Sequence, residues 1–163
     1  FMSEEQKKVY ESSLPEVKTA NTHILSSLFD DHFFERIELL NNKYENQPKD
    51  DKWIVLGSNS WVKGAMQSEN WCKDNGVKHE VIFGMEYDQF LKRLAQAKGL
   101  CAMPTGYDTC PRLVIEAKLL GCALQTNENV QHRDEEWFNK PNAEIIKYLK
   151  TRKDYFWMHA FNV

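Results

Sequence analysis

Short apolar runs alternate with longer amphipathic segments through the middle of the chain. The runs suit buried strands and occur at residues 53–56, 80–83, 100–103 and 123–126. Segments with apolar residues at helical spacing lie before and between them, at residues 30–44, 64–73, 87–98 and 111–120. This alternation predicts an α/β fold, a Rossmann-like parallel sheet with helices on both faces.

The two ends of the chain are predicted to be helical. Ser3–Gln6 has the sequence of a capping box that opens a helix fading near Pro15, and Phe1–Met2 before it has the character of a strand end. Thr22–Leu28 is predicted to be a short extended segment. After Pro141, apolar residues at helical spacing predict a C-terminal helix.

Composition and charge narrow the function classes. The chain has 163 residues, a net charge of −3, 42% hydrophobic residues and 28% charged residues, which fits one soluble globular domain rather than a disordered chain. Because the charges nearly balance and no basic patch stands out, nucleic acid is not expected as a partner. No apolar run approaches the ~20 residues of a membrane helix, so we expect a cytoplasmic protein without a transmembrane segment.

The cysteines and histidines give no metal-site pattern. The four cysteines, at positions 72, 101, 110 and 122, form no C-x-x-C pair, and we expect reduced structural thiols and no metal. Cys110 differs because it lies beside a predicted helix N-terminus, which favours a thiolate. A hydrolase with Cys110 as nucleophile is a hypothesis, although no cysteine-protease signature surrounds it.

In a parallel sheet, the loops that follow the strands share one edge, and ligands bind there. The loop GSNSWVKG at residues 57–64 follows the first predicted strand and places Lys63 at the start of a helix. It lacks the Walker A pattern, and the chain has no G-x-G-x-x-G motif. Lys63 suits a phosphate group, but the loop alone favours a solvated lysine. Trp61 in the same loop is expected to be a packing residue.

Glu116 is a carboxylate in an otherwise apolar helix, eight residues after Asp108. The helix must be largely buried, and a buried carboxylate needs partners. One interpretation is an i,i+4 ion pair with Arg112, which contributes about 0.3–0.5 kcal/mol. The other is that Glu116 accepts hydrogen bonds from two ligand hydroxyls, as an acidic residue does for ribose in dinucleotide sites. The helix alone does not decide between them.

Three segments together resemble one enzyme family. Residues 104–126, PTGYDTCPRLVIEAKLLGCALQT, are similar to the donor-binding motif of the group 1, or family 4, retaining glycosyltransferases of GT-B fold. In that motif a loop leads into a helix of the form E-A-x-x-x-G, and another acid precedes the Glu by eight residues. Residues 57–64 resemble the family's G-R-x4-K-G loop, and residues 81–84 with the following helix resemble its strand–glycine loop. The resemblance covers residues 53–127, in the family's order.

By this resemblance the chain binds a nucleoside-diphosphate sugar as donor substrate, without a metal or other cofactor. Lys63 is then expected to hold the pyrophosphate, Glu116 the ribose hydroxyls and Asp108 the transferred sugar, and these three are the implied catalytic residues. The other implied donor-binding residues are Gly57 and Ser58 in the first loop, Gly84 and Met85 beside the base, and Thr109, Cys110, Pro111 and Arg112 against the sugar and phosphate.

The chain also departs from the family's pattern. Asp108 stands where the family usually has Glu, and the shorter side chain implies an altered sugar preference. Ser58 stands where the family usually has Arg, so one phosphate contact is missing unless Arg112 or Arg133 replaces it. The sheet is expected to be one strand and one helix shorter than the family's donor domain.

The resemblance divides the chain into two parts. Residues 1–27 correspond to a remnant of an N-terminal acceptor domain and its hinge, and residues 28–163 to the donor-binding domain, which is the C-terminal half of a GT-B fold. A saccharide or other acceptor is then expected to bind through the missing N-terminal domain. The alternative hypothesis is a nucleotide-binding or interaction module of the same fold that has lost catalysis.

Overall fold

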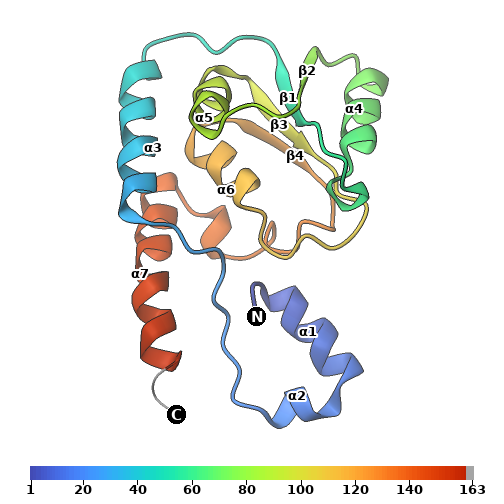
Figure 1. Ribbon diagram of the computed structural model, residues 1–163, viewed down its shortest axis with the longest axis vertical. Helices are drawn as coiled ribbons and strands as arrows, with labels where there is room; N and C mark the ends of the chain where they lie inside the picture. The colour runs from blue at the N-terminus through green and yellow to red at the C-terminus, as the bar shows by residue number, and fades with distance from the viewer. Residues whose placement is uncertain (161–163) are drawn as a thin grey trace.

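The computed structural model describes residues 1–160, and a four-stranded parallel sheet forms the centre of this part of the chain (Figure 1). The inner strands are β1 (Trp53–Leu56) and β3 (Gly99–Ala102), and the edge strands are β2 (His79–Ile82) and β4 (Ala123–Thr126). The strand order is β2-β1-β3-β4, with every pairing parallel. The predicted Rossmann-like α/β class is confirmed.

The predicted strands are correct to within one residue. β1 and β4 have the predicted bounds, whereas β2 and β3 each begin and end one residue earlier than the apolar runs indicated. The pairing register explains this shift, because Trp53 at the start of β1 is aligned with His79 on one side and Gly99 on the other. The three strands therefore begin at aligned residues, whether or not the first side chain of each strand is apolar.

Helices cover both faces of the sheet, as predicted. α4 (Ala65–Asp74) packs on one face, against β1 and β3. On the other face lie α5 (Tyr87–Gln96) and α6 (Arg112–Leu119), with α3 (Asp31–Tyr44) packed against α5 (Figure 1). The loops that lead into α4, α5 and α6 all leave the carboxyl ends of strands, which is the edge where a ligand was expected.

Successive residues of β1 face the two halves of the core. Ile54 is fully buried in the larger cluster, with Leu91 of α5 and Ile115 of α6. Val55, the next residue, is fully buried in a smaller cluster with Cys72 and Cys101 on the α4 side. This alternation is the two-residue period of a strand, and it makes β1 a central strand that is covered on both faces.

The capping box predicted at the N-terminus is present. α1 (Glu4–Ser13) begins after Ser3, whose hydroxyl accepts a 3.0 Å hydrogen bond from the backbone N–H of Gln6. The side-chain oxygen of Gln6 in turn accepts from the backbone N–H of Met2 at 2.7 Å. Two N–H groups at the start of the helix are thereby satisfied reciprocally.

The first helix ends near Pro15, as predicted, since α1 ends at Ser13; Pro15 then begins a second short helix, α2 (Pro15–Thr19), at whose first turn a proline is well tolerated. Phe1–Met2 is irregular chain rather than a strand end, although the carbonyl of Phe1 accepts from Leu25 N–H at 2.7 Å. Residues 22–28 form no strand and include Ser26 in the left-handed region, at φ 60°.

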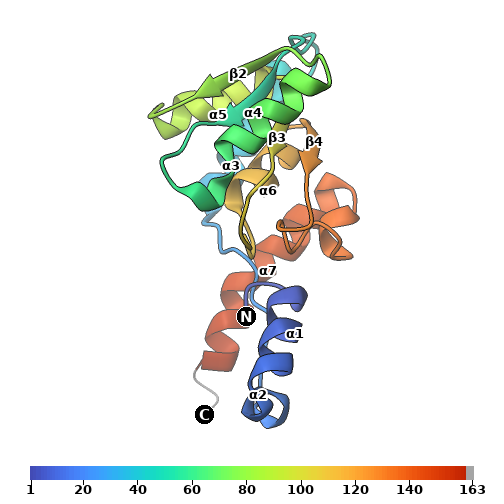
Figure 2. The same ribbon diagram turned by 90° about the vertical axis from the view of Figure 1, so that its right-hand side faces the viewer.

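The N- and C-terminal helices lie together at one end of the molecule. α7 (Asn142–Ala160) follows the 3-10 helix η2 (Trp137–Asn139) and extends away from the sheet at the same end of the molecule as α1 and α2 (Figures 1 and 2). No helix within residues 1–160 combines the length and apolar character that a membrane crossing requires. The last three residues of the predicted domain 28–163 lie outside the described residues.

Candidate functional site

A cavity of about 450 Å³ opens at the carboxyl ends of β1 and β3, and we call it the rim cavity. Leu56 and Ala102, the last residues of these two strands, line it. The loop before α4 and the loop before α6 therefore face the same cavity. The predicted site residues among its lining are Lys63, Asp108, Cys110, Pro111 and Arg112.

A glycine fixes the position of the Lys63 loop. Lys63 ends the 3-10 helix η1 (Trp61–Lys63), and Gly64 after it has φ 60°. A Cβ atom on Gly64 would lie 1.9 Å from the carbonyl oxygen of Met103, so this approach requires glycine. The N–H of Thr105 also donates to the carbonyl of Val62 at 3.0 Å. Lys63 is thus held against the chain that follows β3.

Residues that follow β4 fix the Asp108 loop. The backbone N–H of Asp108 donates to Asn129 at 2.8 Å, and its carbonyl accepts from Gln131 at 3.1 Å, which forms an isolated parallel bridge. The side-chain amides of Asn127 and Asn129 both donate to the carbonyl of Pro104, at 2.9 and 2.8 Å. Hydrogen bonds therefore hold this loop at two positions, the carbonyl of Pro104 and the backbone of Asp108.

Lys63 and Asp108 form an ion pair in which Nζ lies 2.7 Å from Oδ2. The Lys63 side chain is 42% exposed, and that of Asp108 is 17% exposed. Lys63 is thus partly solvated, as the loop alone indicated, and its ammonium also has a carboxylate partner. A phosphate group that enters the rim cavity has to compete with Asp108 for Lys63.

Gly57 and Ser58 lie in the same loop, but neither lines the rim cavity. Gly57 extends the pairing of β1 with β2, since its N–H donates to Ile82 at 2.7 Å, and a Cβ atom there would lie 2.7 Å from the Phe83 ring. The Ser58 hydroxyl accepts from the N–H of Ser60 at 3.1 Å. Ser58 therefore shapes the loop and supplies no positive charge.

Of the two arginines that were considered as replacements for a cation at position 58, one lines the cavity. Arg112, at the start of α6, lines the cavity, and its guanidinium lies 4.6 Å from the centre of the Phe29 ring. Arg133 does not line the cavity and pairs with Asp134 at 3.0 Å. Of these two arginines, Arg112 is therefore the one that shares a cavity with Lys63.

Glu116 is buried, with 4% of its surface exposed, and its side chain accepts a hydrogen bond from a tyrosine. The hydroxyl of Tyr87 donates to Glu116 Oε1 at 2.9 Å, whereas the Arg112 Nε atom lies 3.8 Å from that oxygen. Burial raises the pKa of Glu116, and the Tyr87 hydrogen bond and the Arg112 charge act against that rise. The predicted i,i+4 pair of Glu116 with Arg112 exists, but its atoms are 3.8 Å apart. The contact with Tyr87 was not predicted, because Tyr87 in the sequence is one position of an apolar helical stripe.

Gly84 and Met85 form the turn between β2 and α5 and do not line the rim cavity. Gly84 has φ 63°, and Met85 is exposed. The chain continues within two residues to Tyr87, whose hydroxyl reaches Glu116. The predicted base-binding turn and the predicted ribose-binding carboxylate are thus joined by one hydrogen bond.

The expectation that Cys110 favours a thiolate is wrong. Cys110 is buried, and burial raises the pKa of its thiol to about 11. Pro111 caps α6, and the Ser27 hydroxyl donates to the Cys110 carbonyl at 2.7 Å, which packs residues 26–27 over this position. Thr109 beside it is half-buried. The desolvation of the thiol outweighs the helix N-terminus, and a Cys110 nucleophile has no support.

The other cysteines behave as packing residues. Cys72, Cys101 and Cys122 are free and buried, and burial raises the pKa of each thiol. Within residues 1–160, no group of three or more His, Cys, Asp or Glu side chains is placed to hold a metal ion.

Two further residues at this edge were not identified as site residues from the sequence. Ser68 of α4 lines the rim cavity, donates to the Gly64 carbonyl and accepts from Met103 N–H, both at 2.9 Å. No sequence signal distinguishes it from a surface serine. Trp61, which was expected to be a packing residue, is 73% exposed, and its ring lies close to Gly106.

No protein-family model, curated protein or solved structure matches this chain.

Proposed function

We propose that the chain carries the donor-binding site of a retaining glycosyltransferase of GT-B fold, and that the donor is a nucleoside-diphosphate sugar. One observation carries the proposal: Lys63, Asp108 and Arg112 line one cavity at the ligand-binding edge of a Rossmann-like sheet. Reduced, buried cysteines support a cytoplasmic location. In this proposal the acceptor binds on a further domain.

The diphosphate is the part of the donor that these residues suit best. When the bond between sugar and phosphate breaks, negative charge grows on the leaving diphosphate, and fixed positive groups stabilise that charge. Lys63 and Arg112 supply two cations, and the free N–H groups at the start of α6 supply a partial positive charge. These groups act without a metal ion, as the resemblance implies.

Binding of the donor is proposed to exchange the partners of Lys63. The ammonium leaves Asp108 for a phosphate oxygen, and the released carboxylate accepts hydrogen bonds from the sugar hydroxyls. The ion pair holds both side chains close to their working positions, because their backbones are tied to residues 103–105 and 127–131. Asp108 is thus a sugar-binding group and Lys63 a phosphate-binding group.

The ribose is proposed to bind at Glu116. A carboxylate has about four acceptor positions, and the Tyr87 hydroxyl occupies one of them. The proposal requires the ribose hydroxyls to reach the remaining positions, since Glu116 is 4% exposed and does not line the rim cavity. Because Tyr87 follows the Gly84–Met85 turn, the same hydrogen bond sets the distance between ribose and base.

Calorimetry with uridine, guanosine and adenosine diphosphates tests this proposal. We expect one of the three to bind and Lys63→Met to weaken that binding, because the variant removes a phosphate-binding charge. Lys73→Met is the control, because Lys73 is exposed at the end of α4 and pairs with Glu69 at 2.6 Å. Absence of binding to all three diphosphates, with wild-type chain shown to be folded by circular dichroism, would overturn the proposal.

A second candidate is a nucleotide-binding or interaction module of the same fold without catalysis. It is favoured by the neutralisation of Lys63 by Asp108 and by the absence of a positive charge at Ser58. The two candidates differ in what happens to the donor. A transferase domain releases sugar slowly to water with retained configuration, whereas a binding module leaves the bound nucleotide sugar intact; anomer-resolved NMR of the products separates them.

A further inference from the structure

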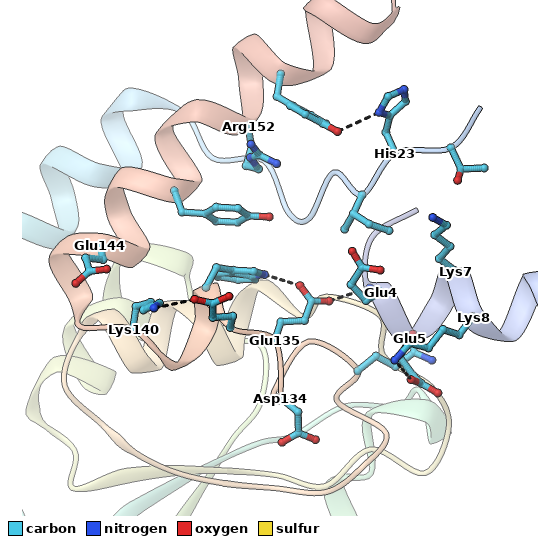
Figure 3. A pocket seen from close by; sticks show the side chains of 17 residues that line it. Glu4, Glu5, Lys7, Lys8, His23, Asp134, Glu135, Lys140, Glu144 and Arg152 are labelled. Carbon is cyan, nitrogen blue, oxygen red and sulfur yellow. Dashed lines mark hydrogen bonds and ion pairs between the residues drawn. The ribbon is translucent and has the colours of Figure 1, made fainter. Parts of the chain in front are cut away.

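A second groove, of about 930 Å³, lies between α1, residues 22–24, the chain before η2, and α7 (Figure 3). It shares no lining residue with the rim cavity. Nothing in the proposed donor site uses it. Its walls come from the two ends of the described chain and from residues 131–140, so its shape depends on how α1 and α7 are placed around it.

One wall of the groove is a continuous stack of side chains from η2 and α7. The Trp137 and Tyr148 rings are 4.8 Å apart and nearly parallel, at 14°. The Arg152 guanidinium lies 4.4 Å from the centre of the Tyr148 ring and 4.3 Å from that of Tyr155. His132 continues the stack beyond Trp137, and burial lowers its pKa to about 3, so it adds an uncharged ring.

Arg152 is held in place by this stack but has no counter-ion within it. Its Nε and Nη2 atoms point to the Thr151 hydroxyl, at 3.3 and 3.2 Å. No carboxylate of residues 1–160 lies within ion-pair distance of its guanidinium. A guanidinium that is held in place and has no counter-ion is suited to bind an anion. Because its side chain is already ordered, binding costs little further conformational entropy.

Lys7 and the titratable ring of His23 lie across the groove from Arg152. Figure 3 shows Arg152 on α7, with His23 and Lys7 on the opposite side. The His23 Nδ1 atom and the Tyr155 hydroxyl are 3.0 Å apart, so His23 is tied to the same wall. Lys7 makes only a 3.7 Å ion pair with Glu11.

Most carboxylates that line the groove already have partners. Glu135 accepts from the backbone N–H of Glu4 at 2.9 Å and from the indole N–H of Trp137. Glu4 and Glu144 are solvent-exposed, so water screens their charge. The remaining acidic residues pair with neighbouring cations: Glu5 with Lys8, Asp134 with Arg133, and Glu136 with Lys140.

We propose that this groove binds a small organic anion and that the Arg152 guanidinium holds its carboxylate or phosphate oxygens. The planar fork of Arg donates two parallel hydrogen bonds to either group. The Tyr148 hydroxyl belongs to the next ring of the stack and supplies a further donor. Lys7 adds positive charge from the opposite side, and His23 adds to it only when it is protonated. The site does not depend on the proposed donor-binding function.

The surroundings of His23 give the site a pH dependence. Burial lowers the pKa of His23, and His159 of α7, the amino group of Phe1 and Lys7 of α1 lower it further. Arg152 lines the same groove, and Tyr155 carries no charge at neutral pH. Because the charged neighbours of His23 are positive, a bound anion raises its pKa. Binding then takes up a proton, and anion affinity increases as the pH falls through the titration of His23.

The test uses sulfate as a non-titrating stand-in for phosphate and malonate as a dicarboxylate, with chloride at matched ionic strength as the baseline. NMR follows the His23 ring and the Trp137 indole N–H. We expect the chemical shifts to change and to saturate with at least one of the two anions. The anion that binds more tightly shows whether the site prefers a phosphate-like group or a carboxylate. Arg152→Met should weaken this binding by about tenfold or more, as expected for loss of a charged hydrogen-bonding group.

One control variant and a second variant of Arg152 complete the test. Lys153→Met removes an exposed charge from the next position of α7 and should leave the affinity unchanged. If Arg152→Met does not fold, Arg152→Lys keeps the charge without the planar fork and should weaken binding. Equal affinity in wild-type chain and the folded Arg152 variant, or shifts no larger than those with chloride, would overturn the proposal.

Discussion

The ammonium of Lys63 lies 2.7 Å from a carboxylate oxygen of Asp108, although the two residues are 45 positions apart in the sequence. Each residue comes from a loop that follows a strand of the sheet, and each loop is tied in place by backbone contacts. The two groups that are proposed to hold phosphate and sugar are therefore each other's counter-ion. Donor binding has to break this pair, and the energetic consequence is measurable.

Asp108→Asn is expected to increase the affinity for a nucleoside diphosphate. The variant leaves Lys63 without a competing carboxylate, and partly exposed ion pairs contribute about 0.2–1 kcal/mol, so the gain is up to about fivefold. The same variant should lose affinity for the corresponding nucleotide sugar, because the sugar contact is removed. Calorimetry with both ligands measures the two effects. A fall in affinity for the diphosphate alone would show that Asp108 does not compete for Lys63.

Glu116→Gln is expected to change the pH dependence of stability. Because burial raises the pKa of Glu116, the folded protein keeps a proton that the unfolded chain has already lost. The free energy of unfolding contributed by this group therefore falls as the pH rises from about 4.3, its unfolded value, through the raised native pKa. The variant lacks this decrease. Urea titrations at several pH values between the unfolded and the native pKa of Glu116 measure the free energy of unfolding. With rising pH, the wild-type protein should lose stability relative to Glu116→Gln.

Tyr87→Phe tests the same pair from the other side. It removes the hydroxyl that donates to Glu116 and leaves a buried carboxylate with one partner fewer, which costs about 1–3 kcal/mol. The loss should be larger above the native pKa of Glu116 than below it, because the ionised form needs the donor. If the stability loss is independent of pH, the hydrogen bond does not stabilise the ionised form.

Gly64→Ala and Gly76→Ala form a matched pair of substitutions. Both glycines have left-handed φ values, of 60° and 63°, but a Cβ atom on Gly64 meets the Met103 carbonyl, whereas a Cβ atom on Gly76 has no atom within 4 Å. Gly76→Ala should cost about 1–2 kcal/mol for the backbone conformation alone. Gly64→Ala should cost about 2–5 kcal/mol, because overpacking is added. Urea unfolding measures both; equal costs would contradict the close approach at Gly64.

These pairs show what the sequence could and could not predict. The apolar runs located the strands, and the rule that loops after parallel strands share an edge placed Lys63 and Asp108 near one another. The Tyr87–Glu116 contact was not predictable, because it depends on how α5 and α6 pack, and Tyr87 in sequence is one more apolar position in a helical stripe. The error at Cys110 has the same origin, since burial by distant residues decides its pKa.

Thiol alkylation should be slow at every cysteine of the folded chain. The four thiols are buried, and burial raises the pKa of Cys110 and Cys122 to about 11, so little thiolate is present at neutral pH. Mass spectrometry after iodoacetamide treatment should show modification only when the chain is unfolded in urea. Fast modification of Cys110 in the native protein would revive the hypothesis that it is a nucleophile.

Glu135→Ala is expected to loosen α1 from the rest of the molecule. Glu135 accepts the backbone N–H of Glu4 at 2.9 Å, and this charged contact lies at the start of α1, where the helix has free N–H groups. Its loss should increase hydrogen exchange of α1 amides by about tenfold, with α5 amides unchanged. Glu136→Ala is the matched control, since Glu136 is exposed and pairs with Lys140 at 2.8 Å. An equal increase in the two variants would mean that removal of a charge, rather than the contact with Glu4, loosens the helix.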